Sequence, residues 1–227
     1  MRLNKYLSDA GVCSRREADR LTEAGEITVN GKRAETGMQV ESGDVVVVKG
    51  KTVVPEEKKV YLAFNKPRGI VCTAEKREKN NVIDYLSYPV RIYPVGRLDK
   101  DSEGLLLMTN DGAIVNGIMR ARNRLEVNKE ITPEFLKKMA SGVPILDTVT
   151  RPCRIQKTGE RSFTIILTQG LNRQIRRMCE ALGYRVTKLK RVRIMNIHLK
   201  DLKTGEYRPL TEKELAELKK QIGEEKR

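Results

Sequence analysis

The apolar residues of this chain occur in short runs, and this feature limits the folds that the chain can adopt. The longest runs, such as Val45–Val48, have the length of one β-strand and fall far short of the roughly 20 apolar residues of a membrane-spanning helix. Helical patterns separate these runs in irregular order, not in a repeating strand–helix–strand order. We expect an α+β fold.

Residues 1–50 contain two helical patterns followed by strand patterns. Apolar residues recur at helical spacing over Leu3–Ala10, and Ser14 with Glu17 three residues later forms a capping-box pattern that starts a second helix. The next strand pattern leads into an Asn30-Gly31 turn. We expect a small module with the order helix, helix, hairpin.

A short charged stretch, residues 51–59, follows this module and predicts a linker. The second domain, 60–227, begins with a strand that ends at Pro67, because proline cannot continue a central strand. Thr132 followed by Pro133 predicts the start of a helix. Further helices are expected around 113–122, 172–182 and 211–222, and a strand over 186–199.

Basic residues are concentrated towards the C-terminus. The formal net charge is +15, and residues 151–227 carry twenty Lys or Arg against nine Asp or Glu. Clustered cations favour a polyanion, since each neutralised phosphate releases condensed counterions. A well-solvated surface is the plain alternative, but this excess favours a nucleic-acid partner. The N-terminus lacks the apolar block of a secretory signal, so we expect a cytoplasmic protein that does not insert into a membrane.

The cysteines and the histidine limit the possible chemistry. The chain has four cysteines, far apart and without a Cys-x-x-Cys pair, and His198 is its only histidine. This composition disfavours a zinc site, a disulfide framework and a Ser-His-Asp triad. Catalytic groups are therefore expected among Asp, Glu, Lys, Arg, Tyr and Cys.

One polar loop between apolar strand patterns is the most informative segment of the chain. It reads Gly96-Arg-Leu-Asp-Lys-Asp-Ser-Glu-Gly-Leu-Leu and places acids beside a basic residue. Loops held by rigid flanking strands often carry catalytic groups. A salt-bridged turn is the plain alternative for Arg97 and Asp99.

This loop and several other segments, in the same order, resemble the RsuA/RluB/RluE/RluF group of pseudouridine synthases. That group combines an S4 RNA-binding domain with a catalytic domain, and the resemblance covers nearly the whole chain. It implies an α+β fold in which the second domain has a mixed, mainly antiparallel sheet. The segment at Gly170 is most similar to RluF-type enzymes, which act on large-subunit ribosomal RNA. The matching segments are Arg2-Leu-Asn-Lys-Tyr-Leu, Cys13-Ser-Arg-Arg-Glu-Ala, Val29-Asn-Gly-Lys, Gly43-Asp, Asn65-Lys-Pro-Arg-Gly, Gly142-Val-Pro-Ile-Leu-Asp, Gly170-Leu-Asn-Arg-Gln-Ile-Arg-Arg-Met-Cys-Glu and Leu189-Lys-Arg-Val-Arg-Ile.

The resemblance implies isomerisation of a uridine in ribosomal RNA to pseudouridine, without a cofactor or metal. Asp99 would be the essential aspartate, and Arg176 the basic residue that pairs with it. Arg97 would fill the gap left by the flipped uridine, and Leu189 would line the base pocket or pack in the core. An ionised carboxylate can act as a nucleophile or remove a proton from the sugar, and both routes stay open.

Basic side chains in both domains are candidates for RNA contacts. In the first domain, the N-terminus of the helix at Ser14 favours a phosphate through its free N–H groups and its dipole. The candidates are Lys5, Ser14, Arg15, Arg16, Lys32 and Arg33 in the first domain, and Arg173, Arg177, Lys188, Lys190, Arg191 and Arg193 in the second. We expect a monomer.

One segment of the family pattern is missing. The family has a Lys-x-Tyr segment before the helix that corresponds to Thr132–Met139, and its tyrosine packs against the target uracil. This sequence has no tyrosine there and is several residues shorter. A stretch missing from the sequence, a true deletion in a damaged enzyme, and replacement by Tyr93 or Tyr184 all remain possible; the first agrees best with the intact state of every other motif.

Two other functions compete with catalysis on RNA. A non-catalytic RNA-binding or ribosome-assembly protein on the same scaffold would explain the missing tyrosine. A metal-dependent hydrolase could use Asp99, Asp101 and Glu103, but the arginine-rich surroundings disfavour this reading.

Overall fold

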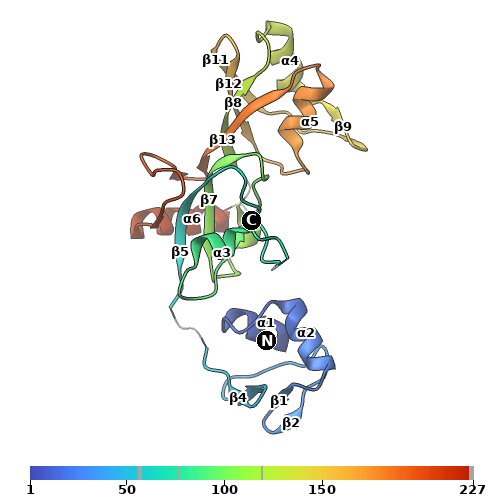
Figure 1. Cartoon of the computed structure of the whole chain (residues 1–227), viewed down its shortest axis with the longest axis vertical. Coiled ribbons are helices and arrows are strands. Elements are labelled where there is room, and N and C mark those ends of the chain that lie inside the picture. Colours follow the sequence, from blue (N-terminus) through green and yellow to red (C-terminus); the bar gives the residue numbers. More distant parts are fainter. Residues whose placement is uncertain (56–57, 76, 119, 225–227) are drawn as a thin grey trace. The chain divides into compact units, whose positions relative to one another are not determined.

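The computed structural model describes residues 1–55, 58–75, 77–118 and 120–224 (Figure 1). Contacts divide the chain into two compact units. The first comprises Met1–Val60, Tyr88–Ile92 and Asn110–Gly112, and the second comprises Tyr61–Ser87, Tyr93–Thr109 and Ala113–Arg227. None of the helices in the described ranges is long and apolar enough to cross a membrane.

The first unit confirms the expected order of two helices followed by strands. Its small sheet is antiparallel throughout, with the strand order β2-β1-β3-β4. Leu7, Ala18 and Ile27 are fully buried between the helices and this sheet. The elements are α1 (Leu3–Asp9), α2 (Arg15–Glu23), β1 (Ile27–Val29), β2 (Lys32–Arg33), β3 (Val46–Val48) and β4 (Lys51–Thr52).

Local sequence signals explain the boundaries in this unit. Ser14 is the N-cap of α2, and its Oγ accepts a hydrogen bond from the Glu17 backbone N–H at 3.2 Å. Asn30 and Gly31 both have positive φ and connect β1 to β2 as a two-residue turn. Because β4 pairs with β3, the sheet extends into the stretch 51–59; residues 56 and 57 of that expected linker lie outside the described residues.

The second unit is built on one large mixed sheet. Its strand order is β11-β12-β8-β13-β7-β5-β15, with β14 paired to β13 and β6 paired to β7. The elements are β5 (Tyr61–Lys66), α3 (Val82–Leu86), β6 (Tyr93–Val95), β7 (Glu103–Thr109), the 3₁₀ turn η1 (Val115–Gly117), β8 (Ala121–Val127), α4 (Pro133–Ser141), β9 (Pro144–Ile145), β10 (Thr148–Val149), β11 (Arg154–Gly159), β12 (Ser162–Leu167), α5 (Gln174–Ala181), β13 (Val186–Ile194), β14 (Ile197–His198), β15 (Tyr207–Pro209) and α6 (Glu212–Glu224).

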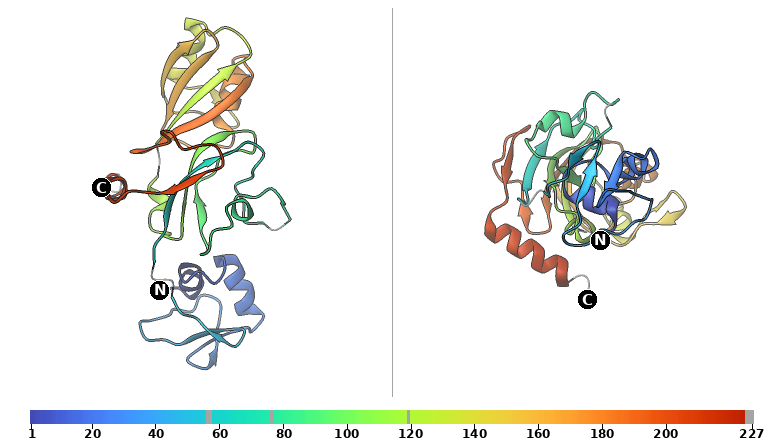
Figure 2. Two further views of the ribbon diagram at one scale, coloured as in Figure 1. Left: turned by 60° about the vertical axis from the view of Figure 1, so that its left-hand side comes forward. Right: turned by 90° about the horizontal axis from the view of Figure 1, so that it is seen from below.

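The large sheet has two cores, one on each side of the contact between β7 and β13. Strands β8, β12 and β13 pack against α4 and α5, as Figure 2 shows from two further directions. Strands β5 and β7 pack against α6 through residues such as Leu107 and Leu218. All strand pairs in this sheet are antiparallel except β7 with β13, which confirms the expected mixed, mainly antiparallel arrangement.

Gly104 permits the parallel contact between β7 and β13. Its φ is +106°, and a Cβ at this position would lie 2.7 Å from the Arg191 backbone nitrogen and would also overlap the Arg191 carbonyl. Any side chain would therefore separate the two strands at the point where the two cores meet. This contact lies immediately after the polar loop 96–102, so it also fixes where that loop ends.

We predict that Gly104→Ala destabilises the second unit by about 2–5 kcal/mol. The left-handed backbone costs about 1–2 kcal/mol, and overpacking against Arg191 costs about 1–3 kcal/mol more. Gly69→Ala is the matched control, since Gly69 has φ +89° but open space around an added Cβ. Urea unfolding measures both variants, and equal losses of stability would contradict the close-contact explanation.

Three elements near the site can be compared with the sequence predictions. The prediction of a helix around 113–122 is wrong: the chain forms η1 and then enters β8 at Ala121, because β8 pairs with both β12 and β13. The strand expected over 186–199 is broken at Met195, which has positive φ and begins the turn to β14. Thr132 caps α4 as expected, accepting from the Phe135 N–H at 3.1 Å.

Candidate active site

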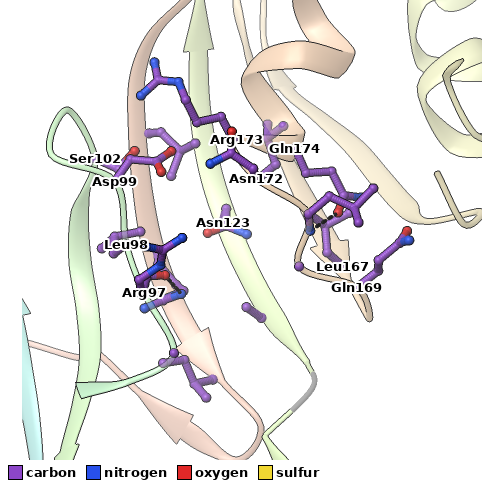
Figure 3. A pocket seen from close by; sticks show the side chains of 18 of the residues that line it. Arg97, Leu98, Asp99, Ser102, Asn123, Leu167, Gln169, Asn172, Arg173 and Gln174 are labelled. Atoms are coloured by element: carbon purple, nitrogen blue, oxygen red, sulfur yellow. Dashed lines mark hydrogen bonds between the residues drawn. The ribbon is translucent and has the colours of Figure 1, made fainter. Parts of the chain in front are cut away.

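A pocket of about 500 Å³ opens in the second unit where the loop before β7 and strands β8 and β13 approach the start of α5. In Figure 3, Arg97 and Asp99 lie on one wall, and Asn172 and Arg173 lie on the opposite wall. Asn123 of β8 lies between these walls and is 4% exposed. The polar loop found in the sequence therefore faces a cavity.

The loop 96–102 is fixed along its length. Its Leu98 side chain is buried, and the Leu98 N–H donates to Cys72 Sγ at 3.4 Å. The Gly69 N–H donates to the Lys100 carbonyl at 2.8 Å, and the Ser102 N–H donates to the Asp99 carbonyl at 3.0 Å. Asp99 is half-buried on the pocket wall, whereas Arg97 is exposed. Asp99 thus sits on a rigid backbone with its carboxylate at the cavity.

Arg176, in the first turn of α5, holds the end of this loop. Its Nη2 donates to the Asp101 carbonyl and to Ser102 Oγ, both at 3.2 Å, and its Nη1 donates to the Val186 carbonyl at 3.3 Å. Burial lowers the pKa of Arg176 and the Arg173 charge lowers it further, whereas Asp101 and Asp99 oppose this. Arg176 and Asp99 line the same pocket, but these two described residues form no ion pair with each other.

Arg191 lies beneath the loop, a position that the sequence interpretation missed. Its Nε donates to the Leu105 carbonyl at 2.7 Å, and its Nη1 donates to the Arg97 carbonyl at 3.4 Å. Its Nη2 is buried and forms no hydrogen bond with the described residues. The Arg191 side chain also lines the pocket. Burial lowers the pKa of Arg191 to about 10, against the opposing charges of Cys72 and Asp99. The side chain therefore stays cationic at neutral pH.

Lys66 supports the same loop from behind and was also missed. It is fully buried, and its Nζ donates to the Pro67 and Ile70 carbonyls, both at 2.8 Å. Burial lowers the pKa of Lys66, and among the charges that oppose this are Cys72 and Asp99. Lys66 thus orders the turn after β5, whose Gly69 in turn holds the loop at Lys100.

The alternation of β13 divides the predicted RNA contacts between two faces of the sheet. Leu189 and Arg191 line the pocket, with Leu189 also packed in the core. Successive strand side chains point to opposite faces, so Lys188 and Lys190 face away from the pocket. Arg193 also points away, because the register shifts between Arg191 and Arg193. The sequence shows the alternation of residues 188–191, but the register shift that turns Arg193 away depends on the pairing with β8.

The other predicted contacts are placed as follows. Arg173 lines the pocket and forms an ion pair with Asp101 at 3.3 Å. Arg177 donates to the backbone and side-chain oxygens of Asn172 at the same end of α5. In the first unit, Lys5 pairs with Asp9, Arg33 donates to the Glu23 carbonyl, and Arg15, Arg16 and Lys32 are exposed.

None of the described residues that line the pocket is aromatic. Tyr184 stacks against Phe135 with ring centroids 4.1 Å apart and donates to the Glu130 carbonyl, so it belongs to the core. Tyr93 is not a lining residue either. The short connection from η1 to β8 supplies Ile118 and Arg120 to the wall; Met119 lies outside the described residues.

We predict that Arg191→Met lowers kcat by about 10- to 100-fold, since it removes two charged hydrogen bonds to the loop and its flank. KM for RNA should change little, because Arg191 acts on the loop from beneath. Arg193→Met is the matched control on the opposite face and should leave kcat unchanged. An equal fall in kcat in both variants would show that Arg191 does not position Asp99.

Comparisons with known proteins identify the two parts of the chain. A family model described as S4 domain matches residues 1–46, and one described as RNA pseudouridylate synthase matches residues 60–130. The "Dual-specificity RNA pseudouridine synthase RluF" of Salmonella typhi is 53% identical over 229 residues, which cover 97% of this chain and 79% of that protein. The "Ribosomal large subunit pseudouridine synthase B" of Bacillus subtilis is 38% identical, covering 96% of this chain and 95% of that protein.

A solved structure shows the same fold. A pseudouridylate synthase crystal structure matches with a TM-score of 0.71 and 25% identity, covering 96% of this chain and 99% of the other. The alignment with the Salmonella typhi protein is 229 residues long, although it covers only 97% of the 227 residues of this chain. That relative therefore has residues without a counterpart here.

Proposed function

Since this chain belongs to the family of RNA pseudouridine synthases that carry an S4 domain, we propose that it converts a uridine of ribosomal RNA to pseudouridine. The finer proposal is that the target lies in the large subunit, and that the protein acts as a cytoplasmic monomer without a cofactor or metal. The observation that carries the proposal is Asp99, held on a fixed loop at a pocket that Arg176 and Arg191 also line.

Asp99 supplies the chemistry in this proposal. The reaction breaks the bond between uracil N1 and ribose C1′, turns the base, and joins C5 to C1′. The C5 hydrogen is lost as a proton and N1 gains one, so the composition of the RNA is unchanged. A carboxylate begins this sequence either by attack on the sugar or by removing a sugar proton. Both routes need Asp99 to be ionised beside the leaving uracil.

Two arginines hold the loop that carries this carboxylate. Arg176 and Arg191 both hold backbone carbonyls of the loop or its flanks, and the charge of Asp99 acts on the pKa of each. We assign both to the positioning of Asp99, which extends the role expected for Arg176 alone.

The remaining residues bind and hold the extruded nucleotide. A target base inside a duplex must flip out, which costs a few kcal/mol. Arg97 is exposed at the rim of the pocket and is suited to occupy the gap in the RNA. Leu189 offers an apolar wall for the base, and Arg173 offers a cation for a phosphate. In the first unit, the free end of α2 at Arg15 and Arg16 offers a further phosphate site.

The test is to incubate the protein with unmodified large-subunit and small-subunit ribosomal RNA and to map pseudouridine chemically. We expect new pseudouridine in the large-subunit RNA alone. Modification confined to small-subunit RNA would overturn the subunit assignment and keep the reaction. Tight RNA binding without any pseudouridine would leave the non-catalytic RNA-binding protein as the function.

A further inference from the structure

The face of the sheet that points away from the pocket carries a cluster of basic side chains. We name it the outer basic face and define it by Arg122 and Arg124 of β8, Arg154 of β11, and Lys188, Lys190 and Arg193 of β13. From this face we propose a second RNA-binding surface, which holds the phosphate backbone of a part of the substrate RNA that does not enter the pocket. The proposal rests on the proposed function, because it assigns this surface to the same ribosomal RNA.

The strand register places these residues in rows across the sheet. Arg154 pairs with Ile166, Ile166 with Arg122, and Arg122 with Arg193, so one row crosses four strands. The next row joins Thr164, Arg124 and Lys190. Paired residues in a sheet point to the same face.

The opposite face of the same strands is already occupied. Asn123 and Leu125 of β8 alternate with Arg122 and Arg124, and they contribute to the pocket and to the core against α4 and α5. On β13, Leu189 alternates with Lys188 and Lys190 in the same way. The outer basic face is therefore a separate surface and not the rim of the pocket.

Its positive charge is poorly balanced within the protein. The acids that share its rows are Glu126, which lies 3.9 Å from Lys188, and Glu103, which pairs in register with Lys190. Arg122 donates to Thr164 Oγ1 at 3.5 Å. In the described ranges, the side chains of Arg124, Arg154, Lys190 and Arg193 form no ion pair.

The spacing of these cations suits a phosphate backbone better than a single small anion. Neighbouring strands lie about 4.8 Å apart, and alternate residues along a strand lie about 6.6 Å apart. The cations thus form an open grid, not a closed cage around one ion. Arg124, Arg154 and Lys188 are exposed and long enough to follow an irregular backbone. Since every phosphate that is neutralised releases counterions, such a grid adds affinity without reading sequence.

The experiment compares three variants on two RNAs. The neutral variant carries Arg124→Gln, Arg154→Gln and Lys190→Gln. The control carries Lys79→Gln, Lys137→Gln and Lys213→Gln, which remove the same charge from exposed positions elsewhere. The conservative variant carries Arg124→Lys and Arg154→Lys, and so keeps the charge. The two RNAs are full-length ribosomal RNA and a short hairpin that contains only the target loop.

For the neutral variant on full-length RNA we expect Kd to rise by about 10- to 100-fold, with the slope of log K against log salt smaller by about 2–3. The conservative variant and the control should both retain the affinity of the original protein, and kcat at saturating RNA and affinity for the hairpin should not change in any variant. Unchanged binding of the neutral variant to full-length RNA would overturn the proposal, as would an equal loss in the control. Binding is measured independently of pseudouridine formation. A protein that binds RNA through this face but forms no pseudouridine would therefore overturn the proposed reaction and not the proposed surface.

Discussion

Asp99→Asn is expected to lower the rate of pseudouridine formation by on the order of 10³- to 10⁴-fold, the upper range of what one acid–base group contributes. The amide keeps the shape of the carboxylate but can neither attack the sugar nor accept its proton. The loop should keep its conformation, because its bonds to Cys72, Gly69 and Arg176 involve backbone atoms or other side chains. RNA affinity should therefore be retained.

Single-turnover rates at saturating RNA, together with Kd, measure this effect. Asp101→Asn is the matched control two residues along the loop, where the side chain is half-exposed and paired with Arg173. An exposed ion pair contributes only about 0–1 kcal/mol, so the control should lose less than about tenfold in rate. A similar loss in both variants would mean that the loop is damaged as a whole and that Asp99 has no special role.

Restoring the missing aromatic is expected to raise kcat/KM by about 5- to 150-fold. This range corresponds to the 1–3 kcal/mol by which an aromatic side chain supports a base through stacking. The variant replaces the connection from η1 to β8 with the longer family connection that contains Lys-x-Tyr. This connection already forms part of the pocket wall through Ile118 and Arg120, so we expect a tyrosine inserted there to lie at this wall.

The control for that chimera is the same insertion with alanine at the tyrosine position. It separates stacking from the effect of a longer connection on the fold. If the alanine and tyrosine chimeras have the same kcat/KM, the base does not stack at this wall. If both exceed the original chain equally, the added length and not the ring corrects the pocket.

Local features of the fold could be read from the sequence because they depend on neighbouring residues. Ser14 and Thr132 cap their helices through bonds to a residue three positions later. The helix expected around 113–122 failed for the opposite reason. The chain forms η1 and then, from Ala121, strand β8, because β12 and β13, which lie far away in sequence, supply hydrogen bonds on both sides of this strand.

The main residues of the candidate site could be predicted from the sequence, but their hydrogen bonds and contacts could not. The loop at Asp99 and the segment at Arg176 were recognisable as motifs, and the structure brings both to one pocket. The pairing of Arg176 with Ser102 depends on how α5 packs, which no local pattern encodes. The place of Arg191 under the loop depends on the parallel contact with Gly104. The alternation of β13 was available in the sequence and would have separated Arg191 from Lys190.

Release of tritium from ribosomal RNA labelled at uracil C5 tests the central claim most directly. The C5 hydrogen leaves only when C5 becomes joined to the ribose, so each released atom reports one completed isomerisation. The protein with Asp99 should release tritium until its target uridines are consumed, and Asp99→Asn should release almost none in the same time. Binding of the RNA by both proteins with no release from either, or with equal release from both, would contradict the assignment of Asp99 as the group that remakes the glycosidic bond.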